Sequence, residues 1–114
     1  MFGVEIQKST YEFAKENLEK SGYDKKVKLI LGDGSIGLKE YAPFDKILLS
    51  AAAPSLPEPI RRQVKVRGVI VAVIGTSRFN QELIQFEKNE DETFSKKNLG
   101  GVIFVPLQGK YGMK

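Results

Sequence analysis

Cysteine and histidine are both absent from this chain of 114 residues, and its apolar runs are short. Without cysteine there are no disulfides or thiolate metal sites, and without histidine the commonest general base and metal ligand is missing. The longest apolar runs, 47–49 and 69–74, fall far below the ~20 residues that a bilayer requires, and no signal peptide precedes them. We therefore expect one cytoplasmic domain over 1–114, with no metal and no membrane contact.

The beginning of a nucleotide-binding sheet is also missing. Residues 2–6 read like the second strand of such a sheet, with no first strand before them. A Rossmann-type site needs a first strand, a glycine-rich turn that approaches the ligand, and an acidic residue about 20 residues later for the ribose hydroxyls. This chain offers a candidate for the acid only, so we expect an incomplete cofactor site.

The charge of the chain is moderately basic. Eighteen Lys and Arg residues against fourteen Asp and Glu give a net charge of +4. The basic residues fall in short clusters without interleaved aromatic residues, which favours a solvated surface over a nucleic-acid interface. A nucleotide or RNA binder remains a minor alternative. Hydrophobic content of 41% and charged content of 28% are typical of a globular protein.

The first half of the chain alternates strands and helices. After the strand at 2–6, Ser9 with Glu12 forms a capping-box pattern, and Gly22 offers a stop for the helix between them. Further strands are predicted at 27–31 and 44–50, and a short helix at 58–64. The run at 69–74 is β-branched and apolar on both faces, which predicts a central parallel strand.

The second half reads as strands in hairpins. Residues 82–88 predict a strand, 89–92 a turn, 94–97 its return, and 102–107 a last strand. Alternating elements followed by hairpins predict an α/β fold with a mostly parallel sheet and an antiparallel edge.

Two acids follow successive predicted strands. Glu5 lies at the carboxyl end of the first, where ligands bind in parallel sheets and where a carboxylate can accept both hydroxyls of a ribose. A solvated charge at a strand end is the alternative. Asp33 lies between Gly32 and Gly34, which would leave backbone N–H groups open to a ring edge. An ordinary turn explains Gly-Asp-Gly as well. Two acids at successive strand ends are more specific than either one.

Small and amide side chains follow later strands. Ser50 and the alanines up to Pro54 would leave room for a ligand, and a tightly packed loop would need small residues equally. Gln63 and Gln81 lie near strand ends, where most amides cap or solvate.

These motifs together resemble one family. The residues Gly32-Asp-Gly34, Ala42-Pro-Phe-Asp45, Ala51-Ala-Ala-Pro54, Gln63, Gly75, Gln81-Glu-Leu83 and Val102-Ile-Phe-Val-Pro-Leu107 occur in the order and spacing of protein-L-isoaspartate O-methyltransferases. The resemblance covers nearly the whole chain, and it corresponds to about the second half of a full-length member.

The resemblance implies an S-adenosylmethionine-dependent, Rossmann-like methyltransferase sheet that lacks its first strand. It implies that Glu5 holds the ribose and that Asp33 with Gly34 reads the adenine. The cofactor-binding residues it implies are Glu5, Ile6, Asp33, Gly34, Ser50 and Ala51. The implied reaction methylates the α-carboxyl of isoaspartyl residues in damaged proteins. A carboxylate is already ionised at neutral pH, so alignment can supply much of the rate without a general base.

Departures from the family pattern set further expectations. The glycine-rich turn and the segment that faces the substrate carboxylate are absent, so no catalytic residue can be named. Arg67 stands where the family usually has glycine. A missing central strand leaves two inner edges unpaired, so we expect an inactive chain that forms a homo-oligomer, closes its sheet, or needs a separate N-terminal half. The alternative is a catalytically dead α/β module that self-associates.

Overall fold

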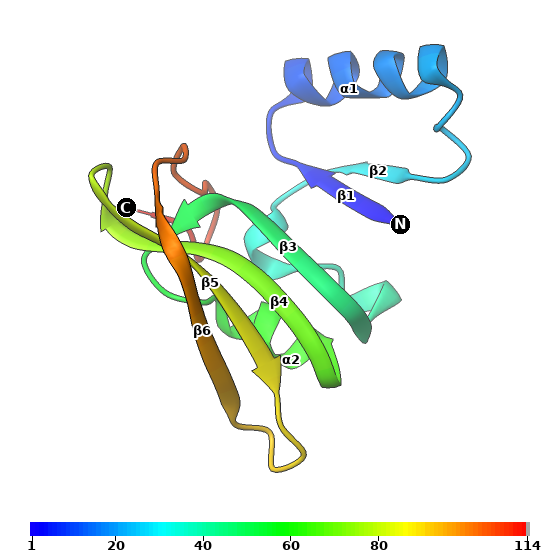
Figure 1. Cartoon of the computed structure of the whole chain (residues 1–114). Helices are drawn as coiled ribbons and strands as arrows, with labels where there is room; N and C mark the ends of the chain where they lie inside the picture. The colour runs from blue at the N-terminus through cyan, green and yellow to red at the C-terminus, as the bar shows by residue number, and fades with distance from the viewer. Residues whose placement is uncertain (114) are drawn as a thin grey trace. The chain divides into compact units, whose positions relative to one another are not determined.

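The structure is a computed structural model that describes residues 1–113. It divides into two compact units, Met1–Gly34 and the part from Ser35 onward, which are described separately. The strands accordingly fall in two sheets, one of two strands and one of four (Figure 1).

The first unit is a β-α-β arrangement. Strand β1 (Phe2–Glu5) and strand β2 (Lys28–Leu31) pair in parallel from Phe2 opposite Lys28 to Glu5 opposite Leu31, and helix α1 (Lys8–Ser21) connects them. This confirms the alternation predicted for the start of the chain. Parallel neighbours end at the same sheet edge, so the carboxyl ends of β1 and β2 lie together.

The sequence predicted the N-terminal end of α1 wrongly and its C-terminal end correctly. The predicted capping box is wrong, because the helix begins at Lys8 and its N-cap is Gln7, which makes no side-chain cap bond. Ser9 and Glu12 thus lie inside the helix, where they cannot cap it. The C-terminal stop is confirmed: Gly22 has a left-handed φ of 80° and its N–H bonds the last carbonyls of α1, a geometry that favours glycine.

The second unit is built on a four-stranded sheet in the order β3-β4-β5-β6. Strands β3 and β4 are parallel and joined through helix α2, while β4-β5 and β5-β6 are antiparallel. The α/β fold with an antiparallel edge is therefore confirmed, and β4 is an inner strand as predicted. Two 3-10 turns, Gly34–Ile36 and Lys39–Tyr41, precede the sheet. The elements of the sheet are β3 (Phe44–Ala53), α2 (Glu58–Gln63), β4 (Val64–Ser77), β5 (Asn80–Lys88) and β6 (Phe94–Val102).

The predicted last strand over 102–107 is wrong. Strand β6 already runs to Val102, and beyond it only Pro106 forms an isolated bridge, with Ala52 of β3. Proline has no N–H to donate to a ladder, so pairing is restricted to the Ala52 N–H with the Val105 carbonyl and the Leu107 N–H with the Ala52 carbonyl, both at 2.8 Å.

The core of the second unit lies between α2 and one face of the sheet (Figure 1). Buried Lys88 closes one end of it, because its Nζ donates to the Arg61 and Val64 carbonyls at 3.1 and 3.2 Å, where α2 ends. The buried cluster of this core comprises Leu49, Leu56, Ile60, Val64, Ile70, Ala72 and Phe86.

Within residues 1–113, no helix is long and apolar enough to cross a membrane.

Candidate functional site

The carboxyl edge of the two-stranded sheet brings three predicted site residues together. Glu5 ends β1, its Cα is opposite Leu31 of β2, and its carbonyl accepts a hydrogen bond from the Gly32 N–H at 2.9 Å. Asp33 and Gly34 follow directly, and all three residues are half-buried. Ile6 comes next to Glu5 and is exposed. The sequence prediction that two acids follow neighbouring strand ends is therefore confirmed.

The glycines around Asp33 are not required by local folding. Neither Gly32 nor Gly34 adopts a left-handed φ. A Cβ at Gly32 would meet nothing within 4 Å, and one at Gly34 would only reach ordinary contact with Val4, 3.6 Å from its Cβ. A turn that needed glycine for its own geometry would show positive φ or a close approach. The geometry of the turn therefore does not account for either glycine.

The other two predicted site residues, Ser50 and Ala51, lie near the end of β3 in the second unit. The prediction that the small residues follow the strand is wrong for positions 51–53, because β3 extends to Ala53. Ala52 and Ala53 are fully buried, so packing alone accounts for their small size. Ser50 is exposed and Ala51 is half-buried, which leaves these two positions accessible at the strand end.

Two buried glutamines fix loops at the two ends of β3, Gln63 near its beginning and Gln81 near its end. Gln81 accepts a hydrogen bond from the Phe104 N–H at 2.7 Å and donates to the Phe104 carbonyl at 3.2 Å. Gln63 accepts from the Leu38 N–H at 2.8 Å and donates to the Ile36 carbonyl at 3.0 Å. Each amide therefore hydrogen-bonds a backbone N–H and a backbone carbonyl of a loop, in place of another backbone segment. This confirms the interpretation that these glutamines cap.

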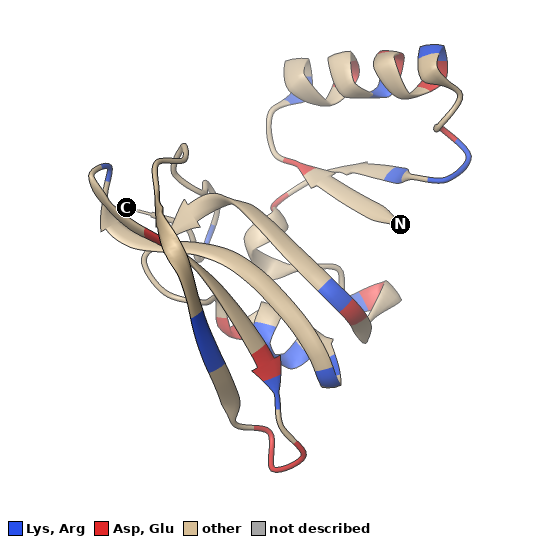
Figure 2. Cartoon of the chain, in the orientation of Figure 1, with Lys and Arg blue, Asp and Glu red and all other residues tan. Residues whose placement is uncertain are grey.

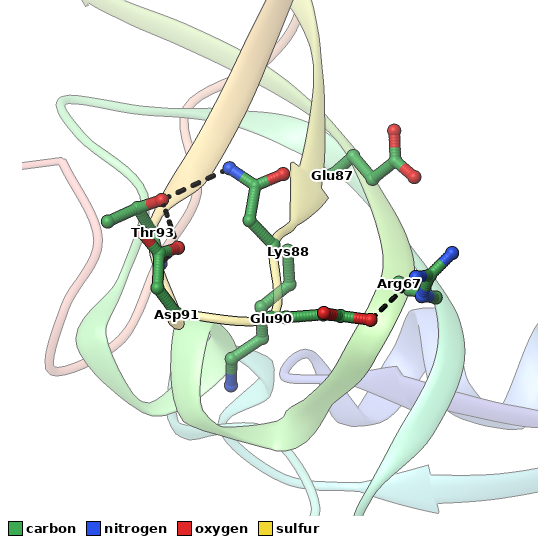
Figure 3. Close-up of a pocket in the computed structure, with 7 residues that line it drawn as sticks. Arg67, Glu87, Lys88, Glu90, Asp91 and Thr93 are labelled. Carbon is green, nitrogen blue, oxygen red and sulfur yellow. Dashed lines mark hydrogen bonds and ion pairs between the residues drawn. The ribbon is translucent and has the colours of Figure 1, made fainter.

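A hollow of about 520 Å³ lies at the turn between β5 and β6 (Figure 3). On one side Arg67 pairs with Glu90 at 2.6 Å, and on the other the Asp91 carboxylate accepts hydrogen bonds from the Thr93 N–H and hydroxyl. The side-chain hydrogen bond from Thr93, reinforced by its backbone N–H, lowers the pKa of Asp91. The Asp91 contacts stay within the turn, and the Arg67–Glu90 pair ties the turn to β4. The hollow thus has the features of a hairpin end.

Arg67, which stands where the resembled family usually has glycine, adopts a backbone conformation that favours glycine. Its φ is 67°, in the left-handed region that favours glycine. The neighbouring Gly68 is required sterically, because a Cβ there would lie 2.7 Å from Val64 Cγ2 and 2.9 Å from the Asp45 carbonyl oxygen. An arginine thus occupies a left-handed position within β4, directly before a glycine that the packing requires.

A second hollow, of about 490 Å³, lies beside α2 and was not predicted. Its lining residues come from distant stretches of the sequence, so no local motif indicated this hollow. They are Ser55, Leu56, Pro57, Glu58, Arg61, Ile74, Ile84, Phe86, Lys96 and Tyr111.

Among residues 1–113 there is no group of three or more acidic side chains placed to hold a metal ion.

Comparison with known proteins gives a consistent result. The family profile described as protein-L-isoaspartate(D-aspartate) O-methyltransferase (PCMT) matches residues 1–112. A protein-L-isoaspartate O-methyltransferase of Thermococcus sibiricus is 43% identical over 115 residues, covering 100% of this chain and 52% of that protein. Protein-L-isoaspartate O-methyltransferase 2 of Archaeoglobus fulgidus is 45% identical over 114 residues, covering 100% of this chain and 51% of that protein. The chain spans about half the length of these curated relatives.

Solved structures agree in fold. One named protein-L-isoaspartate O-methyltransferase superposes with a TM-score of 0.86 at 26% identity, covering 97% of this chain and 35% of its own. A second, from Plasmodium falciparum and described in complex with S-adenosyl-L-homocysteine, has a TM-score of 0.81 at 25% identity and covers 94% and 51%.

Proposed function

Since the chain belongs to the protein-L-isoaspartate(D-aspartate) O-methyltransferase family, we propose that it forms the adenosine-holding half of an S-adenosylmethionine-dependent methyltransferase. The observation that carries this proposal is the carboxyl edge of β1 and β2, where Glu5 and Asp33 end neighbouring parallel strands beside glycines that the fold does not require. The complex of a structural relative with S-adenosyl-L-homocysteine supports the choice of ligand.

Each residue at this edge contacts a different part of the cofactor. The Glu5 carboxylate accepts hydrogen bonds from the ribose hydroxyls, as acids at this position of such sheets do. Asp33 and the Gly34 N–H face the adenine edge, and Ile6 borders the ribose. When bound, S-adenosylmethionine supplies a methyl group on a sulfonium, which is already a good leaving group.

The proposed substrate is the α-carboxyl of an isoaspartyl residue in a damaged protein. That carboxylate is ionised at neutral pH, so a chain without histidine needs no general base for the transfer. Positioning the two reactants supplies much of the rate. None of the residues named here has to move a proton.

We further propose that the chain is inactive alone and works with an N-terminal half of the kind that its relatives contain. Between residues 44 and 51, β3 pairs with β4 on one edge only, and Leu48 on this strand is largely exposed. Such an edge pairs readily with another strand. The alternative is a catalytically dead module that self-associates through this edge, in which case light scattering would give a homo-oligomer with no affinity for cofactor.

Calorimetric titration tests cofactor binding by the chain alone. We expect a dissociation constant for S-adenosylmethionine weaker than micromolar, which corresponds to about −8 kcal/mol, because the residues proposed above contact only its adenosine part. Micromolar or tighter binding by the isolated chain would contradict the need for a partner.

The role of Asp33 is tested after complementation, with the N-terminal half of the Thermococcus sibiricus relative supplied in trans or by fusion. Asp33→Ala should weaken cofactor binding by roughly 1 to 3 kcal/mol, the cost of losing a buried hydrogen-bond partner. Asp24→Ala, which removes an exposed acid from the same unit, is the matched control. A change in melting temperature with unchanged cofactor affinity would assign Asp33 to the turn alone.

A further inference from the structure

We propose that the groove beside α2, defined above by its ten lining residues, binds a segment of the substrate polypeptide that carries an acidic and an apolar side chain close to the isoaspartyl residue. This inference rests on the proposed function, because it assumes a polypeptide substrate. The groove lies wholly within the second unit, so its geometry does not depend on the first.

The floor of the groove is apolar. Ile74, Ile84 and Phe86 come from the face of the sheet that packs against α2, and buried Leu56 forms a wall. Phe86 also packs edge-on against Phe94, with ring centroids 6.4 Å apart. A volume of about 490 Å³ is within the range of ligand sites, and this floor suits an aliphatic or aromatic side chain.

Two cations line this floor. The Arg61 guanidinium lies 5.0 Å from the centroid of the Phe94 ring, and Lys96 Nζ lies 5.9 Å from that of Phe86. Figure 2 shows basic residues on both α2 and β6, the two elements that carry Arg61 and Lys96.

One acid also lines the groove, and it is already engaged. The Glu58 carboxylate is shared, at 3.6 Å from Arg61 and 3.3 Å from Arg62. Lys96 makes no ion pair within residues 1–113, so the groove has a surplus positive charge. An apolar floor with a free cation above it complements a segment that combines an acidic with an apolar side chain.

The groove begins close to the end of β3. Its lining residue Ser55 follows Ala53, the last residue of β3, by two positions. Two residues span at most about 7 Å, so the near rim lies within about two or three residues of an extended peptide from the end of β3. A polypeptide that passes the end of β3 would therefore reach the groove within two or three residues.

The first test uses the chain as it is and fluorescein-labelled isoaspartyl peptides. One peptide carries Glu and Phe two and three residues to either side of the isoaspartate, and its partner carries Lys in place of Glu. Anisotropy titrations should show that the chain binds the Glu peptide at least about fivefold more tightly, with a preference that falls as salt rises. Equal binding of the two peptides would overturn the proposal.

The second test compares two lysines that are adjacent on β6. Lys96 is opposite Phe86 and shares its face of the sheet, whereas Lys97 is opposite Gln85 and lies on the other face. Lys96→Glu should reduce the preference for the Glu peptide to within about twofold or reverse it, while Lys97→Glu should retain it. Both side chains are exposed, and circular dichroism checks that each variant folds. An equal loss in both variants would show general charge attraction and contradict the groove.

The groove and the proposed function fail in different ways. If the complemented domain binds no S-adenosylmethionine, the proposed function is wrong and the groove loses its substrate role with it. If the complemented domain methylates isoaspartyl peptides without regard to acidic neighbours, and the anisotropy preference is absent, only the groove is wrong.

Discussion

The two units of the molecule differ in what they bury. No residue of the first unit, Met1–Gly34, is buried, and Phe13 of α1 is 66% exposed. The second unit contains the entire buried cluster around Ile70, Val64 and Phe86. The unit that carries Glu5 and Asp33 therefore has the proposed adenosine-binding residues without a core, and the unit with the core carries Ser50 and Ala51, the other two side chains considered above.

This difference indicates where each unit gets its stability. Burial of apolar surface is the main favourable term in folding, and the second unit provides it for itself. The first unit has one parallel strand pair and one helix, and a two-stranded sheet is marginal on its own. We therefore expect the first unit, taken by itself, to be the less stable of the two.

Truncating one side chain in each unit should give the largest contrast. Ile70 is fully buried, so Ile70→Ala should destabilise the chain by about 2 to 5 kcal/mol. Leu18 of α1 is only half-buried, and Leu18→Ala should cost less than about 1 kcal/mol. Urea unfolding measures both, and similar losses would contradict the comparison.

Loss of the two hydrogen bonds between the Gln81 amide and the Phe104 backbone should cause an intermediate loss of stability that is restricted to the second unit. Gln81→Ala leaves the Phe104 N–H and carbonyl without their side-chain partner, at a cost of about 1 to 3 kcal/mol. Gln85→Ala, on the same strand and outside these contacts with Phe104, is the control and should cost less than about 1 kcal/mol. Amide chemical shifts should move around Phe104 and stay fixed in β1 and β2. Shifts spread over the first unit would contradict this prediction.

Replacing Arg67 by glycine should change the stability of the chain less than the substitutions above, and in the stabilising direction. Arg67→Gly relieves the left-handed φ of 67°, a gain of about 1 kcal/mol. It also removes the exposed ion pair with Glu90, which is worth about 0 to 1 kcal/mol. We expect the melting temperature to be unchanged or slightly raised, and a clear fall would show that the arginine stabilises the turn.

The pH dependence of Asp91 should be the smallest effect. Its pKa is lowered by hydrogen bonds from Thr93, so ionised Asp91 stabilises the folded state above the unfolded pKa. That contribution is lost as pH falls through the lowered folded pKa. Thr93→Val should raise the pKa of Asp91 towards its usual value, measured by carboxyl NMR titration. An unchanged pKa would assign the shift to the backbone N–H alone.

Much of the fold could be predicted because local patterns carried it. The β-branched run at 69–74 marked an inner strand, and Gly22 marked the end of α1. The misplaced features depended on neighbours in space. Residues 102–107 include several β-branched side chains, which favour a strand. However, Pro106 has no N–H to donate, and the segment pairs with β3 only through one bridge, to Ala52.

The candidate site was predictable only in part. Glu5 and Asp33 could be found because parallel strands bring successive strand ends to one edge. The groove beside α2 joins Ser55, Arg61 and Lys96 with Tyr111, which are far apart in sequence. Only the pairing of β6 with β5 places Lys96 on the face of Phe86, so no spacing rule along the chain could have predicted it.

Amide hydrogen exchange of the chain, alone and with an N-terminal half, tests the central claim most directly. We predict that amides of β1 and β2 exchange with little protection in the isolated chain, while those of β4 and β5 are protected to the level of global unfolding. Adding the N-terminal half should raise protection in β1 and β2 towards that level. Protection of β1 and β2 equal to that of β4 in the isolated chain would contradict the account.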